Sequence, residues 1–414
     1  MSKDKFIPIL RFPEFKNKGE WEEKSLDKVV NDFIVPMRDK PKSLDGETPW
    51  CRIEDFDGMY LSGSKSKQGV SLETIKEMNL KVYPINTLLV SCSADLGRCA
   101  ITLKPLVTNQ TFIGLVPNEE KVNSIYLYYV MTNSRNELNS RSSGTTISYL
   151  SRQQFEKFEI PIPKPTEQQK IAACLSSLDE VITAESQKLE VLKDHKKGLL
   201  QNLLPQAGET VPKFRFKEFE DSCDWQETTL TQVADYENGK AHEQDIADDG
   251  EFIVVNSKFI SQDGEVKKFT NTAFLPATKG DVLMVLSDIP NGKAIAKCFL
   301  VEEDNRYTVN QRICRITPRN LNSKILYYLL NRKPYFLAFD DGVKQTNLRK
   351  EDVLNCPLLI PEDPKEQEKI ADTLSSVDDL IKAQIEKLEA LQLHKKGLLQ
   401  GLFPNVNDGD NGKI

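Results

Sequence analysis

The stretch EQQKIAACLSSLDEVITAESQKLEVLKDHKKGLLQNLLP (167–205) recurs 199 residues later as EQEKIADTLSSVDDLIKAQIEKLEALQLHKKGLLQGLFP (366–404). The two copies are identical at 24 of 39 positions and align without a gap. A second matching pair, LRFPEFKNKGEW (10–21) and FRFKEFEDSCDW (214–225), extends the similarity upstream. The 414-residue chain is therefore an internal repeat, in which each half has a similar lead-in, a divergent body and a long terminal segment.

Each terminal segment carries apolar residues at heptad spacing, which predicts a coiled-coil helix flanked by prolines. The only matching stripe in the chain is on the other copy, so we expect the two helices to pair antiparallel about a pseudo-two-fold axis. Two alternatives remain open: each helix could pack on its own body, or it could pair with a second chain. The seam positions are Leu175, Leu178, Ile182, Leu189, Leu192, Leu199 and Leu203 in the first copy, and Leu374, Val377, Ile381, Leu388, Leu391, Leu398 and Leu402 in the second.

The bodies are expected to be mixed globules of helices and strands. Short β-branched runs alternate with Gly, Pro and Asn turns, while other segments space their apolar residues as helices do. The sequence predicts an α+β fold with bodies at 1–164 and 206–363, long helices at 165–205 and 364–404, and a flexible tail at 405–414.

Composition narrows the possible functions. The 55 basic and 62 acidic side chains leave a net charge of −7, which disfavours a protein that coats nucleic acid by bulk electrostatics. No apolar run reaches the length of a membrane span and the start of the sequence has no signal-peptide pattern, so we expect a cytoplasmic protein without a membrane partner. The eight cysteines form no CxxC pair and are interpreted as buried thiols rather than zinc ligands or disulfides.

No catalytic motif is visible in either half. The chain lacks a phosphate-binding Walker loop, a Gly-rich dinucleotide loop and an Asn/Asp-Pro-Pro-Tyr tetrapeptide. Glu265 and Lys267, with Asp249 upstream, match an acid-x-Lys pattern that is common by chance in so charged a chain. His195 and His394 stand beside lysines near the two helix ends, where basic side chains favour the helix dipole. We therefore expect neither a catalytic nor a metal site in this chain.

The motifs of the repeat resemble those of the specificity subunit of type I restriction-modification systems. They are the IPIPxPxEQxKIA segment (160–172), its second copy ending in EQEKIA (359–371), the two HKKGLLQ helix ends and the RFxEF…W lead-ins. The resemblance extends from about residue 10 to residue 404. It implies two target recognition domains, each reading one half of a split, asymmetric DNA site, on helices that space them and dock two methyltransferase subunits.

The same resemblance implies that restriction subunits join the complex and that this chain has no catalytic role. It implies no cofactor on the chain itself, with S-adenosylmethionine, ATP and Mg²⁺ bound by partner subunits. Partner subunits could also supply most phosphate contacts, which would explain an acidic DNA-binding protein. The acidic helix residues are then expected to face protein: Glu180, Glu185, Glu190, Asp378, Asp379, Glu386 and Glu389.

Two polar loops are the main candidates for DNA contact, because base edges are read by Arg, Lys, Asn and Gln while hydroxyl groups bind phosphates. They occupy equivalent places before the long helices, at 139–154 and 340–350, and differ in side chains. The alternative is that they are solvated turns whose polar residues cap helices. The candidates are Ser140, Arg141, Ser143, Thr145 and Thr146 in the first loop, Lys344, Gln345, Asn347 and Arg349 in the second, and Lys65, Lys67 and Lys293 elsewhere.

One dipeptide, Asn-Gln, recurs at equivalent places in the two bodies. The pairs Asn109-Gln110 and Asn310-Gln311 recur in bodies that otherwise diverge, which favours a structural role over base reading. Two other classes of function compete with DNA recognition. A self-contained restriction or modification enzyme would cleave or methylate DNA alone, and a coiled-coil adaptor for protein or glycan would show no DNA specificity.

Overall fold

The computed structural model describes residues 6–36, 40–93, 95–140, 150–206, 208–290 and 292–404. The expected tail at 405–414 lies outside these ranges. The chain divides into two compact units, which we call unit 1 (Met1–Ser186 with Glu386–Ile414) and unit 2 (Gln187–Ile385). The division cuts through both long helices instead of separating helices from bodies, so each unit contains part of each helix.

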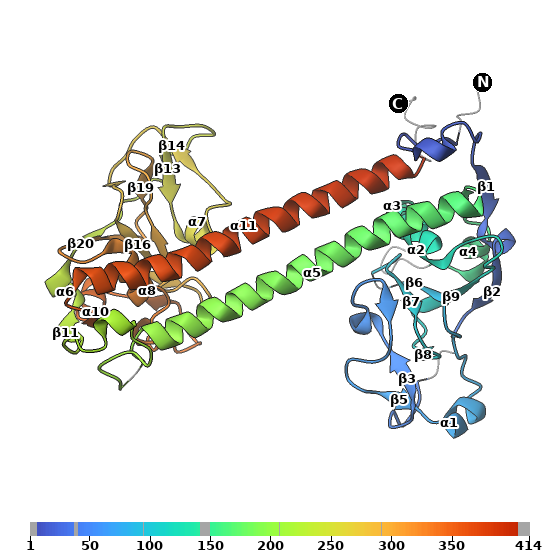
Figure 1. The fold of residues 1–414 in the computed structure, drawn as a ribbon, viewed down its shortest axis with the longest axis horizontal. Coiled ribbons are helices and arrows are strands. Elements are labelled where there is room, and N and C mark those ends of the chain that lie inside the picture. The colour runs from blue at the N-terminus through green and yellow to red at the C-terminus, as the bar shows by residue number, and fades with distance from the viewer. Residues whose placement is uncertain are drawn as a thin grey trace. The chain divides into compact units, whose positions relative to one another are not determined.

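Unit 1 is built around a five-stranded sheet with the strand order β2-β9-β6-β7-β4. Figure 1 labels four of these strands, β2, β9, β6 and β7. A three-stranded sheet, β5-β3-β8, and the pair β1-β10 complete its strands. Helix α2 (Ser124–Asn133) packs against β6 and β7 and buries Tyr126 and Tyr129. The strands are β1 (Glu22–Ser25), β2 (Val30–Ile34), β3 (Thr48–Cys51), β4 (Tyr60–Leu61), β5 (Gly69–Val70), β6 (Leu88–Ser91), β7 (Cys99–Thr102), β8 (Val107–Thr108), β9 (Phe112–Pro117) and β10 (Glu159–Ile162). The shorter helices are α1 (Leu72–Glu77), α3 (Arg135–Ser140) and α4 (Arg152–Glu156).

Unit 2 has two four-stranded sheets, β12-β20-β16-β18 and β14-β13-β19-β15, and the pairs β11-β22 and β17-β21. Helix α8 (Ser323–Leu330) packs against β16, β18 and β20. The strands are β11 (Gln226–Thr229), β12 (Ala234–Asn238), β13 (Phe252–Val255), β14 (Phe269–Thr270), β15 (Pro276–Ala277), β16 (Val282–Val285), β17 (Ser287–Asp288), β18 (Cys298–Leu300), β19 (Tyr307–Val309), β20 (Ile313–Pro318), β21 (Thr346–Asn347) and β22 (Pro357–Ile360). The shorter helices are α6 (Leu230–Val233), α7 (Ser257–Ser261), α9 (Pro334–Leu337) and α10 (Lys350–Leu354).

The long helices are α5 (Pro165–Leu203) and α11 (Pro364–Leu402), each of 39 residues and each beginning at a proline. None of the 14 seam positions is exposed, and Leu175, Leu203, Leu374 and Leu402 are fully buried. Within unit 1 the two helices run antiparallel, because Asp179 pairs with Lys395 and the later residue Glu185 pairs with the earlier residue Lys387.

Each unit buries the C-terminal end of the helix that comes from the other half of the sequence. In unit 1, Phe403 lies 5.7 Å from the ring of Tyr126, which in turn lies 6.3 Å from the ring of Trp21. In unit 2, Leu203 and Leu204 of the first half enter the core. The α+β repeat expected from the sequence is thus confirmed, and each helix packs on both its own body and the other one.

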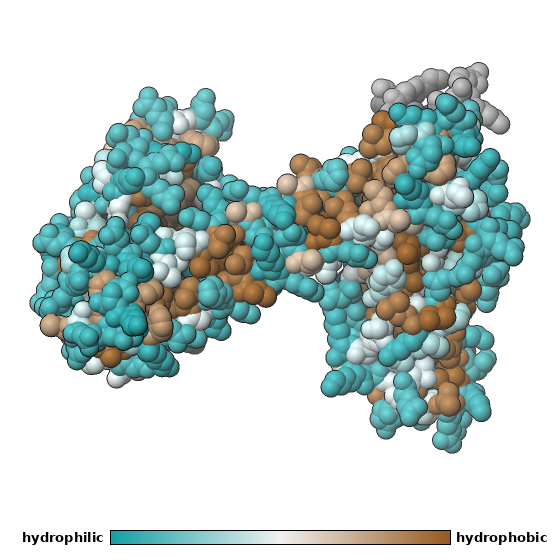
Figure 2. All heavy atoms as spheres, in the orientation of Figure 1, coloured by the Kyte–Doolittle hydropathy of each residue, from teal (hydrophilic) through white to brown (hydrophobic). Residues whose placement is uncertain are grey.

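Figure 2 shows mostly hydrophilic residues on the visible face of each unit, with hydrophobic residues in smaller groups. Within the described ranges, no helix is long and apolar enough to cross a membrane. The interpretation of all eight cysteines as buried thiols is wrong for two of them, since Cys223 is exposed and Cys174 is only partly buried.

Candidate nucleic-acid interface

A buried ion pair fixes the start of each long helix. In unit 1, Arg11 donates from Nε and Nη2 to the two carboxylate oxygens of Glu167 at 2.7 and 2.8 Å, and Trp21 Nε1 donates to the same carboxylate at 3.2 Å. The side chains of Arg11 and Glu167 are 7% and 2% exposed. The hydrogen bond to Glu167 raises the pKa of Arg11 above its usual value. We call this group the entrance clasp.

Unit 2 repeats the entrance clasp with Arg215, Glu366 and Trp225. Arg215 donates to both oxygens of Glu366 at 2.8 Å, and Trp225 Nε1 donates to Oε1 at 3.4 Å. The clasp explains why RF, EQ and W recur together in the two halves. The motifs are visible in the sequence, but the contact between them is visible only in the fold.

The glutamine that follows each clasp glutamate ties the helix to its body. Gln168 accepts from Asn123 N at 2.8 Å and donates to Pro163 O at 2.9 Å. Gln367 accepts from Asn322 N at 3.0 Å and donates to Pro361 O at 2.9 Å. The EQ dipeptide therefore connects the helix start with the helix α2 or α8 that follows each asparagine.

A second repeated group ties the other helix to the same body. Tyr129 donates to Asp179 Oδ2 at 2.7 Å, and the ammonium group of Lys395 pairs with Asp179 Oδ1 and lies 5.8 Å from the Tyr129 ring. Burial, together with the hydrogen bond to Asp179, raises the pKa of Tyr129 far above its usual value, so the hydroxyl remains a donor. We call this group the Tyr–Asp–Lys triad.

Unit 2 contains the same triad in Tyr328, Asp378 and Lys196. The lysine at the equivalent place in each HKKGLLQ motif, which interrupts the heptad, is therefore the residue that reaches the opposite body. Two of the acidic residues that were expected to face protein, Asp378 and Glu185, contact the other long helix of this chain, where their carboxylates form ion pairs.

In each unit, an equivalent backbone hydrogen bond anchors the candidate loop that precedes the long helix. Leu150 N donates to Cys92 O at 3.0 Å, and Leu348 N donates to Leu286 O at 2.8 Å. In each unit this bond brings the segment before the long helix beside the segment that follows a central strand, β6 in unit 1 and β16 in unit 2. The backbone contact between these two segments is thus the same in both units, whereas the side chains of the segments differ.

In unit 2 the structure brings several sequence candidates together. Strands β17 and β21 pair Ser287 with Asn347 and Asp288 with Thr346. Gln345 Nε2 donates to Ser287 Oγ at 2.9 Å. We call the segments 287–290, 292–295 and 340–349 the reading loops of unit 2, after the role that we propose for them. Their exposed candidates are Lys293, Lys344, Gln345, Asn347 and Arg349.

Some polar side chains of these loops accept hydrogen bonds from backbone amides, as expected if the loops are solvated turns that cap helices. Arg349 N donates to Asp352 Oδ2 at 2.8 Å at the start of α10. Asp341 accepts from Val343 N at 2.9 Å and Lys344 N at 3.0 Å, and these backbone hydrogen bonds lower the pKa of its carboxyl. The capping groups are carboxylates and backbone amides, so the cationic side chains of Lys344 and Arg349 stay exposed.

The candidates of unit 1 are more scattered. Ser140 ends α3, is exposed and donates to Glu137 O at 2.8 Å. Four other candidates of its loop lie outside the described residues: Arg141, Ser143, Thr145 and Thr146. Lys65 and Lys67 are exposed between β4 and β5, where Lys65 N donates to Asp55 Oδ1 at 2.7 Å. That segment leads into β5 of the three-stranded sheet and is not part of the loop anchored at Leu150.

A cationic group beside the Leu150 anchor was missed from the sequence. Asp95 pairs with both Arg98 and Arg135, and Arg135 Nε also donates to Leu96 O at 3.1 Å. The two arginines are far apart in the chain and occupy no motif, so only the fold reveals that they share one carboxylate. Their side chains remain 40% and 46% exposed.

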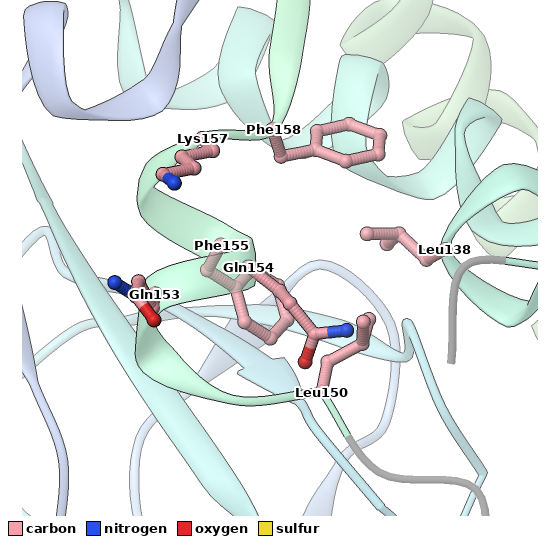
Figure 3. Close-up of a pocket in the computed structure, with 7 residues that line it drawn as sticks. All are labelled: Leu138, Leu150, Gln153, Gln154, Phe155, Lys157 and Phe158. Atoms are coloured by element: carbon pink, nitrogen blue, oxygen red, sulfur yellow. The ribbon is translucent and has the colours of Figure 1, made fainter. Parts of the chain in front are cut away.

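A pocket of about 260 Å³ lies between the two described ends of the first candidate loop (Figure 3). Leu138, Leu150, Phe155 and Phe158 supply its apolar lining, Gln154 extends toward Leu150, and Gln153 and Lys157 complete the lining from the opposite side of α4.

The asparagines of the two recurring Asn-Gln pairs and the histidine His242 have local structural partners. Asn109 Oδ1 accepts from Thr111 Oγ1 at 2.7 Å, and Asn310 Oδ1 accepts from Gln311 N at 2.7 Å. His242 is fully buried, with its ring nitrogens 2.7 Å from Lys240 O and 3.0 Å from Thr308 Oγ1. Over the described part of the chain, no group of three His, Cys, Asp or Glu residues is arranged to hold a metal ion.

The fold is similar to those of solved type I restriction-modification specificity subunits. The type I restriction-modification system S subunit from M. genitalium gives a TM-score of 0.65 at 16% identity, with 96% of this chain and 99% of that chain covered. A second solved chain comes from a study of complex assembly and conformational transition in the type I R-M system. It gives a TM-score of 0.54 at 17% identity, with 93% of this chain and 98% of that chain covered. These likenesses define the class of fold.

The sequence also matches the family model for the type I restriction modification DNA specificity domain twice, over residues 18–194 and 223–390. The chain belongs to this family. It is 25% identical over 395 residues to the type I restriction enzyme MjaVIII specificity subunit of Methanocaldococcus jannaschii, covering 89% of this chain and 91% of that protein. The MjaIX specificity subunit of the same organism is 30% identical over 211 residues, covering 47% and 49%.

Proposed function

We propose that the chain selects the DNA sequence for a type I restriction-modification complex, with each unit reading one half of a split, asymmetric site. The observation that carries this proposal is the shared loop anchor, Leu150 to Cys92 and Leu348 to Leu286, which presents different side chains on the same scaffold. Unit 1 offers Arg98 and Arg135 near this anchor, and unit 2 offers the cations and amides of its reading loops. Two such readers in one chain give an asymmetric bipartite site.

An exchange of bodies tests the modularity of this reading. We replace residues 22–155 with the corresponding body of a related specificity subunit, co-express the hybrid with its methyltransferase and sequence the methylome. The clasp, the triad aspartate and both helices stay unchanged outside the exchanged segment. One half of the methylated site should change and the other should stay the same. The matched control exchanges residues 226–355 and should change the opposite half. A change in both halves from either exchange contradicts independent reading.

We also propose that two copies of the methyltransferase subunit dock on the outer faces of the long helices. The support is a surface that recurs once in each unit: Ser177, Glu180, Val181 and Ala184 on α5, and Ser376, Asp379, Leu380 and Ala383 on α11. All eight residues are exposed, and Val181 and Leu380 expose 44% and 55% of their surface at the same repeat position. Two equal surfaces fit two copies of one partner.

The stoichiometry of the complex tests this docking surface. Val181→Asp should remove one methyltransferase copy and Leu380→Asp the other, because a carboxylate at an apolar contact is desolvated without a partner. Native mass spectrometry then shows one bound copy for each single variant and none for the double variant. Val191→Asp is the control, since Val191 is 66% exposed on α5 but is not repeated. Two copies retained by the double variant would rule the surface out.

We further propose that methylation and cleavage are carried out by partner subunits, which use S-adenosylmethionine, ATP and Mg²⁺, and that restriction subunits complete the complex. This proposal rests on the missing catalytic motifs of the sequence. The purified chain should neither methylate nor cleave DNA until a methyltransferase subunit is added, and its sequence preference should then determine the methylated site. Activity of the chain alone would favour a self-contained enzyme.

A further inference from the structure

Two apolar side chains stand out on the reading loops of unit 2. Val343 is 75% exposed and Ile289 is 70% exposed, the two highest values for large hydrophobic residues in the described part of that unit. Both lie on the same side of the β17–β21 pair, one just after Asp288 and the other shortly before Thr346. The two loop tips therefore emerge from the same end of one short ladder.

Carboxylates hold the backbone of both tips. Asp288 accepts from Ile289 N at 2.9 Å with one oxygen, and from Ala294 N at 2.6 Å and Ile295 N at 3.0 Å with the other. The turn also closes through Gly292 N, which donates to Ile289 O at 2.9 Å. A Cβ atom at Gly292 would lie 2.2 Å from the Asp288 carboxylate, so a larger residue there would have to displace this carboxylate.

The second tip is held in a similar way. Asp341 accepts from the backbone of Val343 and Lys344, and Asp340 Oδ1 accepts from Gly342 N and Thr346 Oγ1, both at 3.0 Å. In both loops, carboxylates thus bind backbone amides beside an exposed branched aliphatic side chain. Exposed apolar surface of this kind lowers its free energy when a partner covers it.

The neighbouring side chains indicate the chemistry of that partner. Lys293 and Lys344 are exposed on the same two loops, and Gln345 and Asn347 offer amides beside them. Cations suit a phosphate backbone and amides suit base edges. The group on DNA that takes an aliphatic contact in the major groove is the 5-methyl group of thymine. Ile289 is the third residue after Leu286, whose carbonyl anchors the loop of unit 2. The equivalent position in unit 1, three residues after Cys92, is Asp95, which pairs with two arginines.

We propose that Ile289 and Val343 make unit 2 a reader of thymine methyl groups, so that its half-site contains at least one thymine whose methyl group is covered by these side chains. This inference rests on the proposed function, because it assumes that the reading loops of unit 2 face DNA bases. It adds the chemical group that is read and the side chains that read it.

Thymine-to-uracil replacement tests the proposal, since it removes the methyl group and keeps every hydrogen-bonding atom. We map the site from the methylome and measure binding of the chain with its methyltransferase to duplexes at one fixed salt concentration. Each thymine of the unit 2 half-site, on either strand, is replaced in turn. At one or more positions uracil should weaken binding about four-fold, as expected for one buried methyl group.

The protein variants complete a double-mutant cycle. In Ile289→Ala or Val343→Ala the thymine and uracil duplexes should bind equally at that position, while Ile85→Ala, which removes an isoleucine that is 61% exposed in unit 1, should keep the four-fold difference. Unchanged melting temperatures show that the variants fold. Uracil replacements in the unit 1 half-site should respond identically in wild type and in the Ile289 and Val343 variants.

Several results would overturn the inference. A unit 2 half-site without thymine on either strand, no uracil effect, or a uracil effect that persists in both variants would do so while leaving sequence-specific binding intact. Loss of the methyltransferase from the Ile289 or Val343 variant, with no uracil effect, would assign the tips to a protein contact. Absence of any sequence-specific binding would instead reject the proposed function.

Discussion

Glu167 and Glu366 show how much of the repeat depends on single carboxylates. Each accepts two hydrogen bonds from an arginine and one from a tryptophan, all in a lead-in segment about 150 residues earlier in the chain. Removing one partner of a buried ion pair leaves the other charge without compensation, which costs more than the pair contributes. The repeat of these motifs follows from the sequence, whereas the contact itself joins residues too distant for any local pattern to reveal.

The clasp leads to a stability prediction. Glu167→Ala should lower the free energy of unfolding of unit 1 by about 3 to 5 kcal/mol, because Arg11 and Trp21 Nε1 lose their buried acceptor. Lys170→Ala is the control on the same helix, since Lys170 pairs with Glu14 at 3.4 Å where both side chains are about half exposed, and it should change stability by less than about 1 kcal/mol. Urea unfolding measures both. Similar small shifts for the two variants would contradict the role given to the clasp.

The long helices are the elements that the sequence describes best, because a heptad pattern and flanking prolines are local signals. Their breaks were harder to interpret. Lys196 and Lys395 interrupt the apolar stripe, yet each completes a Tyr–Asp–Lys triad on a body encoded in the other half of the chain. The loops were the least predictable elements: polar composition located Gln345 and Asn347, but the role of Asp95 with its arginines depends on tertiary contacts.

The heptad seam gives a prediction at this scale. Leu388 is 7% exposed and Leu393, on the same helix, is 70% exposed. Leu388→Asp should lower the free energy of unfolding by several kcal/mol because a buried carboxylate has no partner there, whereas Leu393→Asp should change it by less than about 0.5 kcal/mol. Calorimetry of both variants measures the difference. Equal melting temperatures would show that the seam position of Leu388 contributes little.

At the scale of the whole molecule, neither half of the sequence completes a unit. Unit 1 needs Leu402 and Phe403 from the end of the chain, and unit 2 needs Leu203 and Leu204 from the first half. The sequence predicted two similar α+β bodies and two long helices. It did not predict which body each helix end packs on, because the two copies of the motif, identical at 24 of 39 positions, are similar enough for either end to fit either body.

The similarity of the two helix ends predicts how a half-length chain behaves. A fragment of residues 1–206 lacks the helix end that covers Tyr126, but its own Leu203 and Leu204 occupy the repeat positions of Leu402 and Phe403. We expect two copies to exchange these ends and form a dimer, measured by light scattering. Leu203→Asp in the fragment should give a less stable monomer. A folded monomer of the unaltered fragment would contradict the requirement for a second helix end.

The exchanged helix ends also have a consequence for synthesis on the ribosome. The first segment of unit 1 ends at residue 186, yet the last core residues of this unit, Leu402 and Phe403, follow about 200 residues later. At about 5 to 20 residues per second, this body waits roughly 10 to 40 seconds with part of its core uncovered. During that interval the end of α5 in one nascent chain can pack on the uncovered core of unit 1 in a neighbouring nascent chain. We therefore expect incorrect pairing between chains to arise on polysomes. Chaperone binding to nascent chains should therefore peak between the two helices and fall once residue 403 has emerged.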